Sequence, residues 1–386
     1  MSALATALVK LGHEVSGADR NLNTPNIKNL ISLGISVSPD DGSGIYETID
    51  EVVVSTAIEE TNKDLVKARS LGIKITHRAR ALADALKGYK LIAVAGTCGK
   101  STVTAMLGHI LSVCGLEPMC VNGANVPGWT GAVKFGKGEY AVAEVDESDK
   151  SLVAFKPYAA IITNSSADHY SKSEMDEVFD DFISGIEGPV IDARKEVYKP
   201  EDFNLQNASL AVRMAVAMGV DKDAAEMAME SFGGVERRLQ RISGALVRPV
   251  VFDDYAHNPE KLRSMWMALS KDYSRICALW RPHGYAPLKK MRVDLAKMFN
   301  GVLREGDKLF VLPVYDAGGT VDRSENSDTL VAMIPRSELV NDLDEAFLRM
   351  SKDALNFDAI VTCGARDPEL PALARRLCEY VLNLNR

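Results

Sequence analysis

The 386-residue chain alternates short runs rich in β-branched and other apolar residues with longer stretches that have the periodicity of amphipathic helices. The runs expected to form strands are residues 51–55, 91–95, 140–145, 159–163, 249–253, 275–279, 308–312 and 358–362. Between them lie helical stretches at 62–71, 100–114, 205–218, 259–270 and 368–382. Strands that alternate with helices form βαβ units, in which neighbouring strands run parallel. The pattern therefore predicts an α/β fold built on parallel sheets.

Three blocks follow one another along the chain, with changes in sequence character near Gly88 and Gly234. We expect domains at 1–88, 89–234 and 235–386. Residues 1–11 have the pattern of a helix that ends at Gly12, and 14–18 that of a strand. A doubly wound sheet normally opens with a strand and a glycine-rich turn ahead of its first helix. Neither precedes this helix, so we expect the first domain to be incomplete at its start.

Composition and charge exclude several classes of protein. The 45 Lys and Arg residues are outnumbered by 53 Asp and Glu, which argues against a broad basic surface for nucleic acid. No apolar run approaches the roughly 20 residues needed to span a bilayer. The six cysteines show neither CxxC spacing nor a zinc pattern, and no secretory signal is visible. We therefore expect a cytoplasmic protein that binds neither nucleic acid nor membranes.

The glycine-rich turn between the strand at 91–95 and the helix at 100–114 points most directly to chemistry. It consists of Gly96, Thr97, Cys98, Gly99, Lys100, Ser101 and Thr102. In such a loop, backbone N–H groups and the helix N-terminus surround a phosphate. The lysine then reaches the β- and γ-phosphates, and the hydroxyl after it binds Mg²⁺. The order strand, turn, helix favours a nucleotide site over an incidental turn, although Val94 stands where the strict pattern has glycine.

Two residues of this loop carry further expectations. Cys98 has no evident partner base, so we expect it to contribute its backbone and not to act as a nucleophile. We expect the side chain of Lys100 to be exposed, so that its truncation costs little stability.

Acidic residues and a histidine follow the next strands of the predicted central sheet. Glu144 opens the sequence EVDESD, and Asp168 and His169 follow the strand at 159–163. Because the carboxyl ends of parallel strands meet at one edge of a sheet, these residues are expected beside the phosphate loop. Carboxylate oxygens suit Mg²⁺. The alternatives are a solvated acidic turn and a structural histidine.

The third block opens with further charged residues. Arg237 and Arg238 follow a Gly-Gly pair and either close on a phosphate or form a solvated turn. The strand at 249–253 ends in two aspartates, the second being Asp254, and His257 precedes the following helix. His283 follows the next strand.

Taken in order, these segments resemble the motifs of the Mur ligases, the ATP-dependent amide-forming enzymes of peptidoglycan assembly. The matching sequences are HEVSGAD at 13–19, STAI at 55–58, GTCGKST at 96–102, EVDESD at 144–149, NSSADH at 164–169, GVERRLQ at 234–240, DDYAH at 253–257, PH at 282–283 and CGA at 363–365. The resemblance spans nearly the whole chain and is greatest to the branch that joins L-alanine to UDP-N-acetylmuramate. It implies three domains: a Rossmann-like N-terminal domain for the UDP-sugar, a central P-loop ATPase domain and a Rossmann-like C-terminal domain for the amino acid.

The resemblance also implies the cofactors, substrates and site residues. A substrate carboxylate would attack ATP to give an acyl phosphate, which an amino group would then convert to an amide, with Mg²⁺ bound. The substrates would be a nucleotide-sugar or muropeptide and an amino acid. The implied catalytic residues are Lys100, Glu144, His169 and Arg238, and the implied metal ligands are Ser101, Glu144 and His169. Asn207, Arg238 and Asp254 would join loop 96–102 in binding the nucleotide. Ser55, Arg78, Asn125, His257 and His283 would contact the substrates.

The chain departs from the family pattern at positions that concern substrate recognition. About twenty residues between Phe182 and Asn204 replace a longer insert, and Phe203 stands in place of a histidine near the adenine. Gly284 and Pro287 occupy positions where the family has arginines that serve acidic substrates. We expect binding of Mg²⁺–ATP but weak binding of UDP-sugar. The alternatives are a ligase that recycles muropeptides, a relative outside cell-wall synthesis, and a nucleotide-binding pseudoenzyme or regulatory module.

Overall fold

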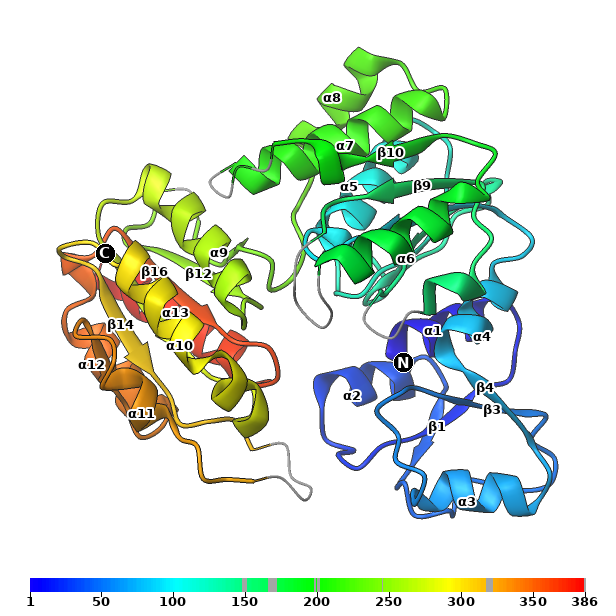
Figure 1. The fold of residues 1–386 in the computed structure, drawn as a ribbon, viewed down its shortest axis with the longest axis horizontal. Coiled ribbons are helices and arrows are strands. Elements are labelled where there is room, and N and C mark those ends of the chain that lie inside the picture. Colours follow the sequence, from blue (N-terminus) through cyan, green and yellow to red (C-terminus); the bar gives the residue numbers. More distant parts are fainter. Residues whose placement is uncertain are drawn as a thin grey trace. The chain divides into compact units, whose positions relative to one another are not determined.

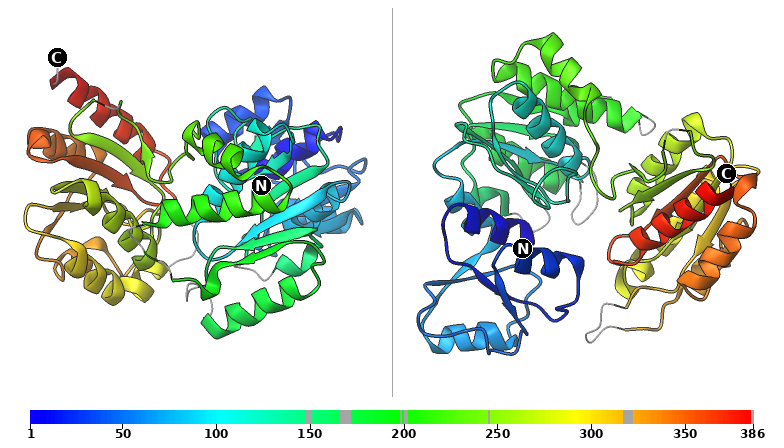
Figure 2. Two further views of the ribbon diagram at one scale, coloured as in Figure 1. Left: turned by 90° about the horizontal axis from the view of Figure 1, so that it is seen from above. Right: turned by 180° about the vertical axis from the view of Figure 1, so that it is seen from behind.

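The computed structural model describes residues 1–147, 151–165, 172–197, 199, 202–244, 246–316 and 322–384. The chain divides into two compact units. The first consists of Met1–Val197 and Leu205–Gly234, and the second of Tyr198–Asn204 and Val235–Arg386. Each unit contains a six-stranded sheet with helices packed on it, as Figures 1 and 2 show. This is the α/β architecture that the alternating pattern predicts.

The N-terminal part of the first unit contains two separate parallel strand pairs, β1 with β2 and β3 with β4. Its elements are α1 (Ser2–Lys10), β1 (Ser16–Ala18), α2 (Pro25–Ser32), β2 (Ser36–Ser38), β3 (Glu51–Val54), α3 (Lys63–Ser70), β4 (Lys74–His77) and α4 (Arg78–Ala85). The strand expected at 14–18 is shortened to three exposed residues. Their sequence, Ser-Gly-Ala, provides no large apolar side chain to bury, which explains why this strand is short.

Local sequence signals set the ends of these helices. The helix α1 ends before Gly12, whose φ of +93° is readily adopted by glycine. At the start of α2, the hydroxyl of Thr24 accepts the Ile27 N–H, and proline follows at the first helical position. The side chain of Asn62 caps α3 in the same way.

The central part of the first unit is built around strand β5. Its elements are β5 (Lys90–Ala95), α5 (Lys100–Val113), β6 (Met119–Val121), β7 (Val133–Lys134), β8 (Tyr140–Glu144), η1 (Ser151–Ala154), β9 (Ala159–Ile162), α6 (Lys172–Ser184), β10 (Val190–Asp192), η2 (Ala193–Lys195), α7 (Phe203–Ala217) and α8 (Lys222–Glu230). The strand order is β10-β9-β5-β8-β6-β7, and β7 pairs antiparallel with β6. Because β5 lies between β8 and β9, the three strands end side by side.

Side chains of β5 alternate between two apolar layers, as expected for a strand buried on both faces. Ile92 and Val94 pack in a cluster that includes residues of α5, α7 and α8. Leu91 and Ala93 pack in the opposite cluster, which includes residues of α1, α4 and α6. The second cluster joins the N-terminal and central parts of the first unit.

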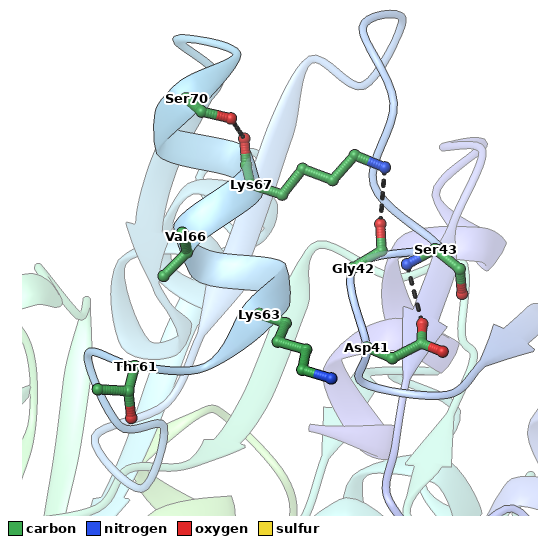
Figure 3. Close-up of a pocket in the computed structure, with 8 residues that line it drawn as sticks. All are labelled: Asp41, Gly42, Ser43, Thr61, Lys63, Val66, Lys67 and Ser70. Atoms are coloured by element: carbon green, nitrogen blue, oxygen red, sulfur yellow. Dashed lines mark hydrogen bonds between the residues drawn. The ribbon is translucent and has the colours of Figure 1, made fainter.

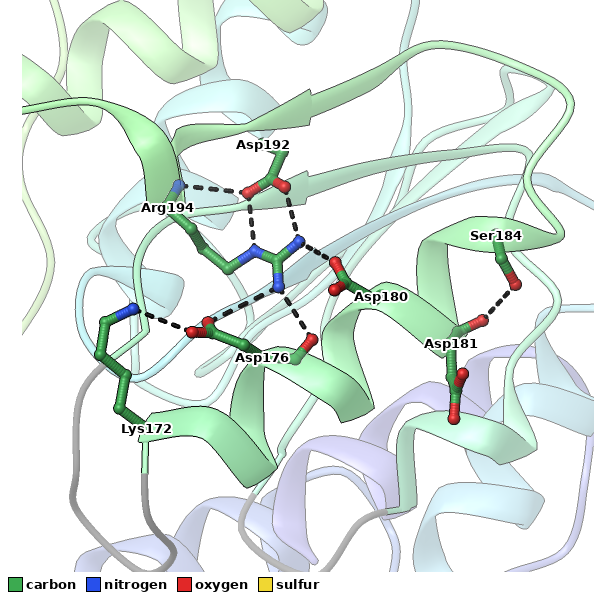
Figure 4. A network of polar contacts seen from close by, with 7 residues as sticks. All are labelled: Lys172, Asp176, Asp180, Asp181, Ser184, Asp192 and Arg194. Carbon is green, nitrogen blue, oxygen red and sulfur yellow. Dashed lines mark hydrogen bonds and ion pairs between the residues drawn. The ribbon is translucent and has the colours of Figure 1, made fainter.

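A buried arginine fastens helix α6 to strand β10 (Figure 4). The guanidinium of Arg194 donates two hydrogen bonds to Asp192, at 2.8 and 2.6 Å, and one to Asp180. It also donates to the main-chain oxygen of Asp176 and stacks on Phe179. A charged network thus ties η2 and β10 to α6, in addition to the apolar packing of Ile191.

The second unit contains a sheet in the order β11-β12-β16-β13-β14-β15. Its elements are β11 (Gln240–Arg241), β12 (Val250–Asp254), α9 (Pro259–Asp272), β13 (Ile276–Trp280), α10 (Tyr285–Val302), β14 (Lys308–Val311), α11 (Ser327–Val331), β15 (Ser337–Leu339), α12 (Leu343–Lys352), η4 (Ala354–Asn356), β16 (Ala359–Cys363) and α13 (Leu370–Leu384). The strand β11 pairs antiparallel with β12, and the other neighbours are parallel. The loops that follow β12, β13 and β16 therefore leave the sheet at adjacent positions.

All of the strands and helices predicted from the sequence occur, and each observed end, including those of the shortened β1, lies within two residues of the expected one. All six cysteines are free thiols in the structure. Within the described residues, no helix combines the length and the hydropathy needed to cross a bilayer.

Candidate functional site

The turn between β5 and α5 has a backbone that requires glycine at two positions. Gly96 and Gly99 have φ angles of +124° and +88°, in the region that favours glycine. A Cβ atom on Gly96 would lie 2.2 Å from the hydroxyl oxygen of Thr163. One on Gly99 would lie 2.6 Å from the side-chain oxygen of Asn207. Conformation and close packing together explain why these residues are glycines.

The end of strand β9 holds this turn in place. The main-chain N–H of Cys98 donates to the side-chain oxygen of Asn164 at 2.9 Å. The main-chain oxygen of Cys98 accepts from the Thr163 hydroxyl at 2.6 Å and from the Asn164 amide at 3.0 Å. Cys98 therefore contributes main-chain groups to the loop, as the sequence led us to expect.

Lys100, the first residue of α5, is buried, and the expectation of an exposed side chain is wrong. Its ammonium donates to the carboxylate of Glu147 at 2.6 Å and to the main-chain oxygen of Gly96 at 2.7 Å. The side chains of Lys100 and Glu147 are only 14% and 8% exposed. Burial lowers the pKa of Lys100, but the carboxylates of Glu147 and Glu144 outweigh it and raise the pKa above its usual value. Lys100 is thus a buried cation that acidic neighbours keep charged.

Glu144 ends strand β8 beside the phosphate loop. It lies opposite Val94 in the parallel ladder between β5 and β8. Its carboxylate accepts the main-chain N–H of Gly123 at 2.8 Å, and a Cβ on Gly123 would lie 2.5 Å from it. The close approach of this backbone fixes the carboxylate at the end of the strand.

The acidic segment after β8 also pairs with the N-terminal part of the unit. The guanidinium of Arg78, at the start of α4, donates to the carboxylate of Asp146 at 2.6 Å. Both side chains are about one-third exposed. Arg78, which the resemblance implies to be a substrate contact, is therefore engaged by a protein carboxylate in this structure.

Asn207 lies on α7 against the phosphate loop. Its side chain is buried, and its amide oxygen faces Gly99. The amide nitrogen is buried with no hydrogen-bond partner among the described residues. A buried donor without a partner is costly, so this atom is suited to a polar ligand at the loop.

Two of the predicted metal ligands, Ser101 and Glu144, lie within the described residues. Ser101 is buried in the first turn of α5, next to Lys100. His169 and Asp168 lie outside the described residues. Among the residues that are described, no group of three His, Cys, Asp or Glu side chains is arranged to hold a metal ion.

In the second unit, Arg237 and Asp253 form a largely buried ion pair. The Arg237 guanidinium donates to Asp253 at 3.0 Å and to the main-chain oxygens of Gly364 and Ala365. The Thr362 hydroxyl donates to the other oxygen of Asp253 at 2.7 Å. These bonds tie the segment before β11 to the ends of β12 and β16.

Asp254 is buried at the end of β12 and accepts hydrogen bonds from the backbone. One carboxylate oxygen accepts the Leu239 N–H at 2.5 Å, and the other accepts the Ala256 N–H at 2.7 Å. Burial raises the pKa of Asp254 to about 6, although these N–H groups and the charge of Arg238 favour the ionised form. Asp254 therefore shapes the turn that carries the following residues.

Three other predicted residues lie near this turn. The guanidinium of Arg238 stacks over the ring of Tyr255, with 4.7 Å to the ring centroid. The ring of His257 packs edge-on against that of His283 at a centroid distance of 4.8 Å. Arg238, Asp254, His257 and His283 are thus brought to the carboxyl ends of β12 and β13.

The remaining predicted residues lie in the first unit. Ser55 directly follows β3, and its main-chain oxygen accepts the Ile58 N–H. Asn125 lies in the loop after β6, where its side-chain oxygen would be 3.5 Å from a Cβ on Gly131.

A surface pocket of about 640 Å³ lies elsewhere in the first unit, between α3 and the loop after β2 (Figure 3). The ammonium of Lys67 donates to the main-chain oxygen of Gly42 at 2.8 Å within it. The pocket is lined by Asp41, Gly42, Ser43, Thr61, Lys63, Val66, Lys67 and Ser70. None of the residues predicted to be functional lines this pocket.

The structure adds residues to the site that the sequence reasoning did not assign. Glu147 is the direct partner of Lys100, and Thr163 and Asn164 hold the loop. All three belong to segments already singled out at the ends of strands. Their roles depend on which strands are neighbours. A sequence prediction that placed β5 between β8 and β9 would have brought these three residues to the loop.

Comparison with known proteins identifies the family in three successive segments of the chain. Residues 1–90 match the Mur ligase family catalytic domain, 94–183 the Mur ligase middle domain, and 237–366 the Mur ligase glutamate ligase domain. The UDP-N-acetylmuramate–L-alanine ligase of a Synechococcus strain is 30% identical over 383 residues, covering 86% of this chain and 78% of the relative. The enzyme of that name from Paenarthrobacter aurescens is 29% identical and covers 95% and 92%.

Solved structures support the same fold. The UDP-N-acetylmuramate–alanine ligase of Thermotoga maritima superposes with a TM-score of 0.83 at 24% identity, covering 100% of this chain and 97% of that one. The murein peptide ligase of Psychrobacter arcticus gives a TM-score of 0.68 at 20% identity, with 99% and 96% covered. The fold therefore has the three-domain plan that the resemblance implies, and the chain belongs to the Mur ligase family of ATP-dependent ligases.

Proposed function

We propose that this chain joins the carboxylate of UDP-N-acetylmuramate to the amino group of L-alanine at the expense of ATP. The names of its relatives suggest these substrates. The observation that carries the proposal is the phosphate loop, in which Lys100 heads α5 beside the carboxylates of Glu144 and Glu147. Such a loop serves phosphoryl transfer, the first step of ATP-driven amide formation.

The residues present fit a nucleoside triphosphate. The left-handed Gly99 leads directly into α5, whose first N–H groups are suited to a phosphate. The amide nitrogen of Asn207, buried without a partner, is a donor for the nucleotide at the same turn. The ammonium of Lys100 would exchange the Glu147 carboxylate for phosphate oxygens. We propose that loop residues 96–102, Asn207, Arg238 and Asp254 bind ATP.

The residues also fit a magnesium ion, since Mg²⁺ takes few protein ligands and keeps water or phosphate oxygens. We propose Ser101, Glu144 and His169 as its ligands. When bound, the ion would offset negative charge on the phosphates. Gly123 would hold the Glu144 carboxylate in position through its N–H.

The proposed chemistry has two steps, and the protein acts mainly by positioning and electrostatics. An oxygen of the substrate carboxylate attacks the γ-phosphorus of ATP, so that ADP leaves and an acyl phosphate forms. The amine nitrogen then attacks the carbonyl carbon, loses a proton and expels inorganic phosphate. Lys100 would stabilise the charge that develops on the transferred phosphoryl group.

We propose that residues 1–88, 89–234 and 235–386 form three domains with separate functions. In this arrangement Ser55, Arg78 and Asn125 would contact the UDP-sugar, and His257 and His283 the second substrate. To contact the UDP-sugar, Arg78 must either release the carboxylate of Asp146 or bind the sugar nucleotide while it remains paired with Asp146.

Phosphate release by the purified chain tests the proposal. ATP, Mg²⁺, UDP-N-acetylmuramate and L-alanine are supplied together and then with each omitted in turn. We expect release only with all four, together with an amide product whose mass corresponds to loss of one water. As a matched control, Lys222→Ala removes an exposed lysine of the same unit and should leave the rate unchanged. Phosphate release that continues when UDP-N-acetylmuramate and L-alanine are both omitted would contradict the proposal.

The same assay separates the alternatives. Replacement of L-alanine by the tripeptide L-alanyl-γ-D-glutamyl-meso-diaminopimelate tests the alternative of a recycling ligase. A structural relative is named as a ligase that uses this tripeptide. A higher kcat/KM for the tripeptide would replace our proposal by that one.

A further inference from the structure

Three loops leave the sheet of the second unit at adjacent positions. They follow β12, β13 and β16, and they carry His257, His283 and Arg366. In open α/β sheets, ligands bind outside the carboxyl ends of the strands. These three side chains are therefore placed where a substrate of this unit would lie.

The guanidinium of Arg366 lies beside Gly284. The φ of Gly284 is 162°, an extended conformation that any residue adopts. A Cβ on Gly284 would meet Pro287 at 3.4 Å, an ordinary contact, and would lie 3.8 Å from a terminal nitrogen of Arg366. Neither the backbone nor the packing requires glycine here. The guanidinium of Arg366 instead lies close to the space that a side chain at Gly284 would occupy.

Arg366 also differs from its neighbours in charge pairing. The adjacent Asp367 is used by Arg281, at 2.6 Å, and Asp253 is used by Arg237. Among the described residues, no hydrogen-bond or ion-pair partner of Arg366 is present, and the residue is exposed. A guanidinium without a carboxylate partner is a ready site for a planar anion, which it binds through two parallel hydrogen bonds.

We propose that Arg366 binds the α-carboxylate of the amino-acid substrate and so selects for a free amino acid; this assignment rests on the proposed ligase function. Two carboxylates enter the reaction, one on each substrate, and they have different roles in bond formation. The muramate carboxylate must attack phosphorus, and a guanidinium clamped on its oxygens would reduce its nucleophilicity. The carboxylate of the amino acid takes no part in bond formation. Anchoring it leaves the amine free to attack.

Kinetics of Arg366→Ala and Arg366→Lys test this assignment. We expect the KM for L-alanine to rise about 10–100-fold in Arg366→Ala, as for loss of a hydrogen bond to a charged group. The KM values for ATP and UDP-N-acetylmuramate should stay within about twofold of wild type. Lysine should recover only part of the loss, because it cannot bind both oxygens in a fork.

L-Alaninamide provides a readout that a structural role would not change. It has the amine of L-alanine but no carboxylate, so wild-type enzyme should strongly prefer L-alanine. Arg366→Ala should lose most of that preference. The control is Arg349→Ala, which removes a half-exposed guanidinium from the last turn of α12 and should behave as wild type.

The possible failures are distinguishable. An unchanged KM for L-alanine, or retained preference over L-alaninamide, would overturn the role of Arg366 while leaving the ligase function intact. A raised KM for UDP-N-acetylmuramate alone would assign Arg366 to the other carboxylate and overturn the proposal. Failure of wild-type enzyme to ligate any amino acid would instead refute the underlying function, and with it this assignment.

Discussion

The pairing of Lys100 with Glu147 couples the proposed catalytic lysine to the stability of the fold. Both side chains are largely buried, and Glu147 has the Lys100 ammonium as its partner at 2.6 Å. Removal of one member of a buried ion pair leaves the other charge without compensation. A loss of activity on substitution of Lys100 therefore has two physical causes, which must be separated.

Two variants separate them. We expect Lys100→Ala to abolish ATP turnover and to lower the free energy of unfolding by about 3–5 kcal/mol, since Glu147 would stay buried without its cationic partner. The double variant Lys100→Ala/Glu147→Gln should recover much of that stability, because the unpartnered buried acid is gone, but none of the activity. Denaturant unfolding and phosphate release measure the two effects. A double variant no more stable than the single one would show that the pair is not energetically coupled.

Asp254 gives the second unit a predictable dependence on pH. Its folded pKa of about 6 lies above the ordinary value of 3.8, so the folded state binds the proton more tightly than the unfolded chain. The stability contributed by this group is complete below about pH 4 and is lost as the pH rises through 6. The difference corresponds to roughly 3 kcal/mol.

Urea unfolding at several pH values between 4 and 7 measures this contribution in wild-type protein and in Asp254→Asn. Other groups titrate in both proteins, so the difference between them isolates Asp254. The wild type should lose stability relative to the variant across this range. Parallel pH profiles for the two proteins would show that Asp254 keeps its ordinary pKa.

At the scale of secondary-structure elements, Arg194 links α6 to β10. Its side chain is 6% exposed and is bonded to Asp192 and Asp180 (Figure 4). We expect Arg194→Ala to destabilise the central part of the first unit by about 2–3 kcal/mol. Hydrogen exchange should accelerate in α6 and β10 before other elements.

Arg213→Ala is the matched control for this prediction. Arg213 pairs with Glu196 at 2.7 Å, but both side chains are nearly half exposed. Its loss should change stability by no more than about 0.5 kcal/mol. Equal effects of the two substitutions would mean that burial of Arg194 adds nothing to its pairing.

The elements themselves were predictable because their signals are local. The apolar run at β5, the glycines at 96 and 99 and the helical period of α5 all lie within one stretch of sequence. The burial of Lys100 was not predictable in this way. It depends on Glu147, which follows a strand that is distant in sequence and adjacent to β5 only in the folded sheet.

The same distinction holds for the site. Residues at strand ends could be nominated from the sequence, since parallel strands bring their carboxyl ends to one edge. Arg366 could not, because its relation to Gly284 requires β13 and β16 to be neighbours. The strand β1 is also shorter than the predicted one, because its Ser-Gly-Ala sequence offers no large apolar side chain to bury.

At the scale of the whole molecule, the proposed activity draws residues from both compact units. Lys100, Glu144 and Asn207 belong to the first, and Arg238 and Asp254 to the second. The order of motifs along the chain identified the family, and the matches to all three Mur ligase domains agree with it. The central claim is that this enzyme forms an amide through an acyl phosphate.

Transfer of oxygen-18 tests that claim most directly. The carboxylate of UDP-N-acetylmuramate is labelled on both oxygens and supplied with unlabelled ATP, Mg²⁺ and L-alanine in unlabelled water. If a carboxylate oxygen attacks the γ-phosphorus, that oxygen leaves with the phosphate when the amine displaces it. Mass spectrometry should therefore find one labelled oxygen in each released phosphate and one in each amide product. Amide formation with unlabelled phosphate would contradict the account.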